Sequence, residues 1–334
     1  MGFYIEMIGV GEGDSFLLTL DTLERHEVHI LIDGGDGEKS ERVISHIKTY
    51  AKGTVALMIG THLDDDHLGG LIDVIKSGIQ VGTLILNTPG SFAKWLQMRE
   101  VFKSFAKVES MRKIEKSIQT ADDLLSVAKA KGITVETALA GRSWTSGNVK
   151  LSVLSPTPER LENAWAEKII QDISVLSKSQ KYRDMVEKGE AAPPTSFGND
   201  SSIIIELIYN ENPFALLPGD AGAGVIKEVT AKKSYQFLKV PHHGSNTGLD
   251  EDLIKQLRPQ TAFVPVGENS YHHPCLEILE LLKKNGAITF CSEKTIDCRK
   301  ECKAHDFTVL CHRKDKDGRP DWSTVDPKDC KNNL

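Results

Sequence analysis

Two histidines and three aspartates stand together in one short segment, which reads His62-Leu63-Asp64-Asp65-Asp66-His67. Imidazole and carboxylate groups are the ligands that borderline and hard divalent metal ions require. An apolar run at 55–59 precedes the segment and apolar residues at helical spacing follow it, so a buried strand passes into a helix here. Alternate side chains of extended chain point the same way, so we expect His62 and Asp64 to face one ion, and Asp66 and His67 a second. The alternative is a solvated acidic loop whose aspartates cap the helix, which the two flanking histidines disfavour.

Further ligand candidates stand after apolar runs later in the chain. Asp220 follows the run 214–217 and precedes a glycine-containing turn, a position that suits a metal ligand and equally a helix cap. His242 and His243 follow another strand-like run, at 235–240. One of the two is expected to bind metal, and the other to hydrogen-bond nearby or to face the substrate. The alternative for this pair is a role as buried core histidines.

These segments together resemble the metallo-β-lactamase superfamily. Residues 62–67 resemble its HxHxDH metal signature with Asp64 in place of the second histidine, a form similar to the metallo-β-lactamase domain of the competence protein ComEC and its soluble relatives. The resemblance continues, in chain order, at 9–15, 199–207, 216–220, 239–245 and 269–274. It spans about residues 3–292, and its elements gain specificity from occurring in the right order.

The resemblance implies an α/β fold, an αββα sandwich of two mixed β-sheets flanked by helices, with the site at one edge of the sheets. It also implies two divalent ions bridged by Asp220 and a metal-bridging hydroxide that attacks the substrate. We expect Asp66 and Asp220 to be catalytic, and His272, His273 or the non-ligating member of the 242–243 pair to protonate the leaving oxygen. The residues expected to position the substrate are Asn199, Ser201, Ser245, Asn246 and Asn269.

The chain departs from the superfamily in two ways that affect the metals. Many members have a further histidine ligand in the middle of the chain, and this sequence has no clear equivalent, so a water, Asn199 or Asp200 could complete that coordination sphere. Asp64 makes its site harder, so Mn²⁺ and Mg²⁺ compete with Zn²⁺ as the native ions.

Three functions remain open at this point. The resemblance points to a phosphodiesterase or nuclease with DNA or RNA as substrate. The alternatives are a small-molecule ester, lactone or thioester hydrolase and a metal-binding interaction module that docks a protein partner through 158–198. Basic residues interleaved with aromatics at 91–116 could contact nucleic acid, although an ordinary amphipathic helix explains the same pattern.

The elements that must position these residues follow from the apolar patterning. We predict strands at 3–8, 15–20, 28–32, 55–59, 81–86, 133–137, 149–154, 202–209, 214–217, 235–240, 261–264 and 287–291. We predict helices near 38–50, 68–75, 222–232, 249–257 and 275–284, with helical insertions at about 91–131 and 158–198. Several strands follow one another early in the chain, and strands alternate with helices later, which indicates two sheets with helices on their outer faces. One domain over 1–292 is expected, with a cysteine-containing extension at 293–334 packed on it.

Composition narrows the class of protein. The chain has 334 residues, 40% of them hydrophobic and 26% charged, which is ordinary for a globular protein. A net charge of −6 gives no general attraction to nucleic acid or to an anionic membrane. No apolar run is long enough to span a bilayer, and the first residues lack the basic lead-in of a signal peptide. All six cysteines lie late in the chain, so we expect a reducing, cytoplasmic setting without a membrane, and the sequence predicts no oligomeric state.

Some motifs are weaker. The glycines at 9–13 lack the spacing of a dinucleotide loop and predict a tight turn, after which Asp14 could support the metal ligands. Asp33 begins a second turn, placed where the superfamily has a loop near the site. Cys298, Cys302 and His305 could bind a structural zinc with Cys291 or Cys311 nearby, but free thiols are favoured because the spacing forms no pair of CxxC knuckles.

Overall fold

The computed structural model describes residues 3–21, 27–88, 109–164, 199–293, 303–304, 307–314 and 320–325. These residues form two eight-stranded sheets, one with the strand order β16-β15-β1-β2-β3-β4-β5-β6 and one with the order β14-β13-β12-β11-β10-β9-β8-β7. The strands of the first sheet are β1 (Phe3–Ile8), β2 (Phe16–Asp21), β3 (Glu27–Ile32), β4 (Thr54–Gly60), β5 (Gln80–Leu86), β6 (Thr134–Glu136), β15 (Phe307–Lys314) and β16 (Pro320–Val325). Those of the second are β7 (Ser143–Ser146), β8 (Val149–Ser155), β9 (Ile204–Tyr209), β10 (Asn212–Leu217), β11 (Phe237–Lys239), β12 (Thr261–Val264), β13 (Ile288–Cys291) and β14 (Lys303–Ala304).

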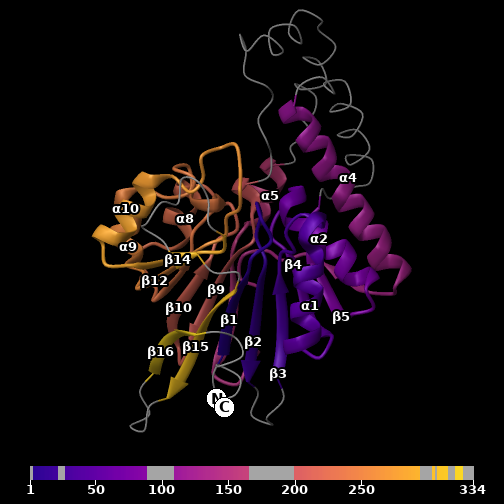
Figure 1. Ribbon diagram of the computed structural model, residues 1–334, viewed down its shortest axis with the longest axis horizontal. Helices are drawn as coiled ribbons and strands as arrows, with labels where there is room; N and C mark the ends of the chain where they lie inside the picture. Colours follow the sequence, from indigo (N-terminus) through magenta and orange to yellow (C-terminus); the bar gives the residue numbers. More distant parts are fainter. Residues whose placement is uncertain are drawn as a thin grey trace, which may run out of the picture.

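The helices lie on the outer faces of the two sheets (Figure 1). The first sheet is covered by α1 (Ser40–Tyr50), α2 (Asp65–Lys76) and α4 (Glu109–Ala130), and the second by α8 (Ala223–Val229), α9 (Glu251–Leu257) and α10 (Leu276–Lys284). The short helix α5 (Pro158–Ala164) precedes a 3-10 turn, η2 (Asn199–Ser201), in the described part of the chain. This arrangement confirms the predicted αββα sandwich of mixed sheets.

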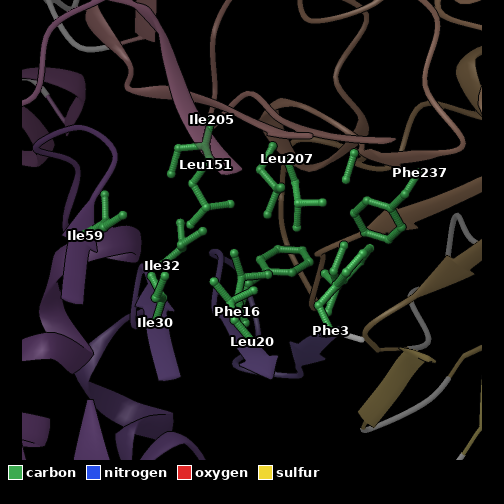
Figure 2. Close-up of a cluster of buried hydrophobic side chains, with 14 of the residues drawn as sticks. Phe3, Phe16, Leu20, Ile30, Ile32, Ile59, Leu151, Ile205, Leu207 and Phe237 are labelled. Atoms are coloured by element: carbon green, nitrogen blue, oxygen red, sulfur yellow. The ribbon is translucent and has the colours of Figure 1, made fainter. Parts of the chain in front are cut away.

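Apolar side chains from both sheets fill the space between them (Figure 2). Phe3, Ile5 and Met7 of β1 alternate toward this inner core, while Ile8 faces the helices outside. In β10, Leu217 faces the inner core and Leu216 packs under the outer helices. The strands are therefore apolar on both faces, which is why they appear in the sequence as nearly continuous hydrophobic runs.

Parallel pairing brings the ends of several strands to one edge of each sheet. β3 pairs in parallel with β4, β10 with β11, and β11 with β12. The carboxyl ends of parallel strands lie at the same edge, and the chain leaves these strands toward Asp33, His62, Asp220 and His243. The residues predicted to do chemistry thus follow strands rather than lie within them.

Parts of the predicted insertions and of the C-terminal extension fall outside the described residues. Of the segment 91–131 the structure describes α4, and of 158–198 it describes α5, so a partner surface on 165–198 stays a prediction. Within 293–334, β14 pairs with β13 and β15 pairs with β1, so the described parts of the extension add strands to both sheets. No helix in the described ranges combines the length and apolarity that crossing a bilayer requires.

Candidate metal centre

The start of α2 is held in place by close backbone contacts. A Cβ atom on Gly70 would lie 2.0 Å from the carbonyl oxygen of Gly34, and one on Gly13, whose φ is +120°, would lie 2.1 Å from that of Asp66. Only glycine permits such approaches, so the turns after β1 and β3 pack directly against the first turn of α2. This packing fixes Asp66 and His67 relative to the strand ends.

Four side chains converge at this point with their ligand atoms facing one another. The Nε2 atom of His67 lies 3.4 Å from Asp220 Oδ2 and 4.0 Å from Asp66 Oδ2. The Nε2 atom of His243 lies 3.2 Å from Asp66 Oδ2 and 3.3 Å from Asp220 Oδ2. A four-coordinate ion with bonds of about 2.1 Å holds its ligands about 3.4 Å apart, so these separations fit a single divalent cation. Of the pair predicted at 242–243, the structure brings His243 to this group.

Each of the two ligand imidazoles is oriented through its other nitrogen. His67 Nδ1 lies 2.9 Å from Asp33 Oδ2, and His243 Nδ1 lies 3.1 Å from the carbonyl oxygen of Pro265. Donation of Nδ1–H to these oxygens leaves each Nε2 lone pair facing the centre, as in many metal sites. Asp33 also accepts hydrogen bonds from the backbone N–H and the hydroxyl of Thr61, at 2.8 and 2.7 Å. From the sequence we assigned Asp33 to a turn near the site and missed this role, which an aspartate directly after a buried strand could have suggested.

A buried lysine lies behind the four ligands. Lys239 is 1% exposed, and its ammonium group contacts the Asp14 carboxylate, lies 3.1 Å from Asp220 Oδ1 and donates to the Gly219 carbonyl oxygen at 2.7 Å. Because Lys239 occupies Oδ1, Asp220 presents Oδ2 to the histidines. Lys239 was not among the predicted site residues, although a lysine inside an apolar strand is a usable signal.

Asp14 belongs to the same buried cluster. Its ligand atom and those of His67, Asp220 and His243 lie within 4.8 Å of one another. Asp66 fits the position of a fourth ligand better than Asp14, because Asp14 approaches both rings from the side of Nδ1, at 3.8 Å for His67 and 3.4 Å for His243. Asp14 therefore supports the ligands from behind.

Negative charge dominates the centre. Burial alone would lower the pKa of His67 and of His243, but Asp220 and the neighbouring carboxylates raise both well above the usual value. Burial would raise the pKa of Asp220, but Lys239 and His243 hold it well below the usual range. This excess of carboxylate charge favours a bound cation.

His62 and Asp64 form a second, adjacent pair. His62 Nε2 lies 3.5 Å from Asp64 Oδ2, and the rings of His62 and His67 have centroids 4.1 Å apart. The Nε2 atoms of His62 and His67 are both buried without a hydrogen-bond partner in the described structure. Buried polar atoms are rarely left without a partner, so both nitrogens fit metal ligation.

His242 and the polar residues around it stand next to the centre. The backbone N–H of His242 donates to Asp220 Oδ1 at 3.2 Å, while its ring Nδ1 lies 3.1 Å from Thr247 Oγ1 and 3.4 Å from Asn199 Nδ2. Burial lowers the pKa of His242. Its side chain thus faces the predicted substrate residue Asn199 rather than the four ligands.

The histidines predicted as acids differ in their surroundings. The His273 ring lies 5.6 Å from that of His242, and burial, followed by the charges of His242 and His243, lowers its pKa to about 4. His273 is therefore neutral at pH 7. His272 is exposed.

The remaining predicted substrate residues lie around the same edge. The Asn269 side chain forms hydrogen bonds with the backbone of Gly267, Tyr271 and His273 in its own loop. Ser245 is buried beside Thr247, with their hydroxyl oxygens 3.0 Å apart, and Asn246 is exposed. Ser201 is buried at the end of η2.

Other candidates lie partly outside the described residues. Most of the basic segment 91–116 lies outside the residues whose side chains the structure describes. Within the part that it does describe, Lys116 forms an ion pair of 2.6 Å with Asp65 at the start of α2. Cys275 is a free thiol, while Cys298, Cys302 and His305 fall outside the described residues.

Comparison with known proteins confirms the resemblance inferred from the motifs. The chain is similar to ComE operon protein 3 of Bacillus subtilis (strain 168), with 25% identity over 302 residues that make up 84% of this chain and 30% of that protein. The chain therefore spans less than a third of that relative's length. No protein-family model matches the chain.

Solved structures with a similar fold include two metallo-hydrolase-type proteins. The metallo hydrolase Igni18 from Ignicoccus hospitalis KIN4/I has a TM-score of 0.43 and 12% identity, with 97% of this chain and 99% of that chain covered. The metallo-beta-lactamase fold protein YhfI from Bacillus subtilis has a TM-score of 0.43 and 9% identity, covering 86% and 95%.

Proposed function

We propose that this chain is a divalent-metal-dependent hydrolase. The observation that carries the proposal is the convergence of Asp66, His67, Asp220 and His243, whose ligand atoms have the separations of a four-coordinate cation site. Bound divalent ions would supply Lewis acidity and lower the pKa of a bound water from 15.7 toward about 7. The chain's own part is to hold the ligands, exclude water from their far side and leave one side open.

Charge supports a pair of ions rather than one. Five carboxylates and one ammonium surround the centre, and they leave four negative charges, which two divalent cations would neutralise. These groups are Asp14, Asp33, Asp64, Asp66, Asp220 and Lys239. In this proposal His62 and Asp64 hold the second ion. The abundance of carboxylate favours Mn²⁺ as well as Zn²⁺.

We further propose a phosphodiester as the substrate class, which makes the protein a phosphodiesterase or nuclease. The similarity to the competence-operon relative supports this choice. The side chains of Asp64 and Asp66 are 37% and 32% exposed, whereas those of His67, Asp220 and His243 are at most 4% exposed. Substrate would therefore approach over Asp64 and Asp66, beside Lys116. Because the pKa of His273 is lowered to about 4, its ring is neutral near pH 7 and lacks the proton that an acid would give to the leaving oxygen.

A small-molecule ester, lactone or thioester is the second candidate substrate. The net charge of −6 favours it, because an acidic protein repels a nucleic acid at long range. The free thiol of Cys275 suits the cytoplasmic setting that we expect for either activity.

The decisive experiment compares substrates across metals. The purified protein would be stripped with a chelator, reloaded with Mn²⁺, Zn²⁺ or Mg²⁺, and assayed on single-stranded DNA, duplex DNA, RNA, a chromogenic phosphodiester and a lactone. We expect metal-dependent phosphodiester cleavage that Asp220→Asn abolishes and that Asp252→Asn, an exposed aspartate on α9, leaves unchanged.

Other outcomes separate the alternatives. Lactone turnover without any phosphodiester cleavage would favour the small-molecule enzyme. Bound metal with no turnover of any substrate would favour an interaction module. A nucleic-acid substrate also requires that KM rise with ionic strength, since phosphate contacts weaken as salt increases.

A further inference from the structure

An exposed tyrosine stands beside the metal centre. Tyr271 is 48% exposed, and it is the one aromatic among the exposed large hydrophobic residues of the described chain. Its ring is stacked with that of His273, with centroids 5.8 Å apart and 27° between the planes. The exposed part of the ring therefore offers an aromatic surface to solvent in the loop that contains His273.

The loop that carries Tyr271 is fixed by one side chain. Asn269 Oδ1 accepts the backbone N–H groups of Tyr271 and His273, both at 3.0 Å. Asn269 Nδ2 donates to the carbonyl oxygens of Gly267 and His273, both at 2.8 Å. The loop therefore has a defined shape between Gly267 and His273.

The same loop is packed against the turn that carries the ligand His243. A Cβ atom on Gly244, whose φ is +82°, would lie 2.7 Å from Pro274 Cβ, and the backbone N–H of Cys275 donates to the Gly244 carbonyl oxygen at 2.9 Å. The His273 ring lies 6.4 Å from that of His243. Tyr271, His273 and His243 thus form a series of rings that leads from solvent to the metal ligands.

We propose that Tyr271, backed by His273, stacks a nucleobase next to the scissile phosphodiester. This inference rests on the proposed nuclease function and names the part of the substrate that is recognised. A base offers a flat face to an aromatic ring whatever its identity, so stacking holds a single strand without selecting its sequence. A fixed ring near the centre would place the adjoining phosphate over the ligands with little loss of entropy. Duplex DNA keeps its bases stacked on one another, so the site favours single strands or ends.

The test compares variants on substrates with and without a base. Tyr271→Ala is expected to raise KM for single-stranded oligonucleotides by roughly 5- to 150-fold with little change in kcat, while Tyr271→Trp retains wild-type values. On an oligonucleotide whose cleavage site is flanked by abasic residues, wild type and Tyr271→Ala should have the same KM. Tyr50→Ala is the matched control, because Tyr50 also contacts a histidine, His46, at the end of α1.

The outcomes distinguish this inference from the function on which it rests. If wild type cleaves oligonucleotides and Tyr271→Ala has an unchanged KM, the stacking proposal is wrong and the nuclease proposal stands. An equal rise in KM on ordinary and abasic substrates also overturns it, since the effect would then not involve a base. If wild type cleaves no oligonucleotide, both proposals fail.

Discussion

The two nitrogens of the His67 ring have different surroundings, and Asp33 is the reason. Its Oδ2 atom lies 2.9 Å from His67 Nδ1 and also accepts the Thr61 hydroxyl. We expect Asp33→Asn to weaken metal binding by about 10- to 100-fold, because an amide cannot accept all of these hydrogen bonds and the ring loses its fixed orientation. Titration against a chromophoric chelator measures this change.

A matched control for this variant lies on the same helix as His67. Asp73 on α2 accepts a hydroxyl hydrogen bond from Ser40 at 2.9 Å, and Asp73→Asn should leave metal affinity unchanged. Equal affinities for Asp33→Asn and wild type would contradict the role of Asp33.

Lys239 places a positive charge among the buried carboxylates, in addition to the charges that the raised pKa values of His67 and His243 give their rings in the absence of metal. Removing one partner of a buried ion pair costs about 3–5 kcal/mol, so Lys239→Met should lower the free energy of unfolding by that amount in a chelator. Added Zn²⁺ or Mn²⁺ should stabilise this variant more than wild type, because the cation replaces the missing charge. Chemical denaturation with and without metal measures both effects.

The control for Lys239 is Lys233, a partly exposed lysine that pairs with a buried carboxylate elsewhere. Lys233 lies 2.9 and 3.0 Å from the two carboxylate oxygens of the buried Glu206, away from the centre. Lys233→Met should destabilise the protein by the same amount with metal as without. If metal stabilises Lys239→Met no more than wild type, our account of Lys239 is wrong.

The two classes of residue in the site differ in how well a sequence predicts them. His62, Asp64, Asp66 and His67 are adjacent in the chain, and their types alone indicate metal chemistry. Asp33 and Lys239 contact the site only because distant strands end at the same edge, so their positions beside or within apolar strands mark them as unusual without indicating which residues they contact. Asp14 was predicted to support the metal ligands only because it follows a glycine-containing turn. Which of His242 and His243 faces the other ligands depends on backbone turns that spacing does not specify.

At the scale of elements, strands with an apolar run on each face were predictable, whereas of the edge strands only β6 was predicted, at 133–137. The runs at β4 and β10 have inward and outward hydrophobic residues, so their patterns stand out. β7 reads Ser-Trp-Thr-Ser and lies at the edge of its sheet, where few apolar residues are needed. β15 and β16 lie in a segment that we treated as an extension, because its cysteines and charges conceal the alternation.

Close packing between the glycine turns and α2 gives a prediction at this scale. Replacing a helical glycine by alanine ordinarily stabilises a helix, but a Cβ on Gly70 would lie 2.0 Å from the Gly34 carbonyl oxygen. Gly70→Ala should therefore destabilise the protein by about 1–3 kcal/mol and weaken metal binding, since the backbone around His67 must move. Gly224→Ala, on α8, meets nothing within 4 Å and should raise stability by up to about 1 kcal/mol. Equal effects of the two substitutions in urea denaturation would contradict this account.

At the scale of the whole molecule, the candidate centre joins the two halves of the sandwich. Asp66 and His67 belong to the helix that follows the first sheet's β4, whereas Asp220 and His243 follow β10 and β11 of the second sheet. A cation held by all four therefore adds a link between layers that also meet through the apolar inner core and the buried ion pair of Lys239 with Asp14. Binding to the folded state alone raises its stability according to ligand concentration and affinity.

Metal removal should consequently destabilise both sheets together. At a free metal concentration of about 100 times Kd, the ion contributes roughly 2.7 kcal/mol to the free energy of unfolding, and a chelator removes it. Circular dichroism and tryptophan fluorescence should report a single shift in urea midpoint, because the ligands come from both halves. Asp220→Asn should abolish the metal-dependent shift, and Asp252→Asn should retain it in full. Asp220 is the carboxylate whose Oδ2 atom faces both His67 and His243. A metal-dependent shift that survives in Asp220→Asn would therefore mean that the stabilising ion binds elsewhere.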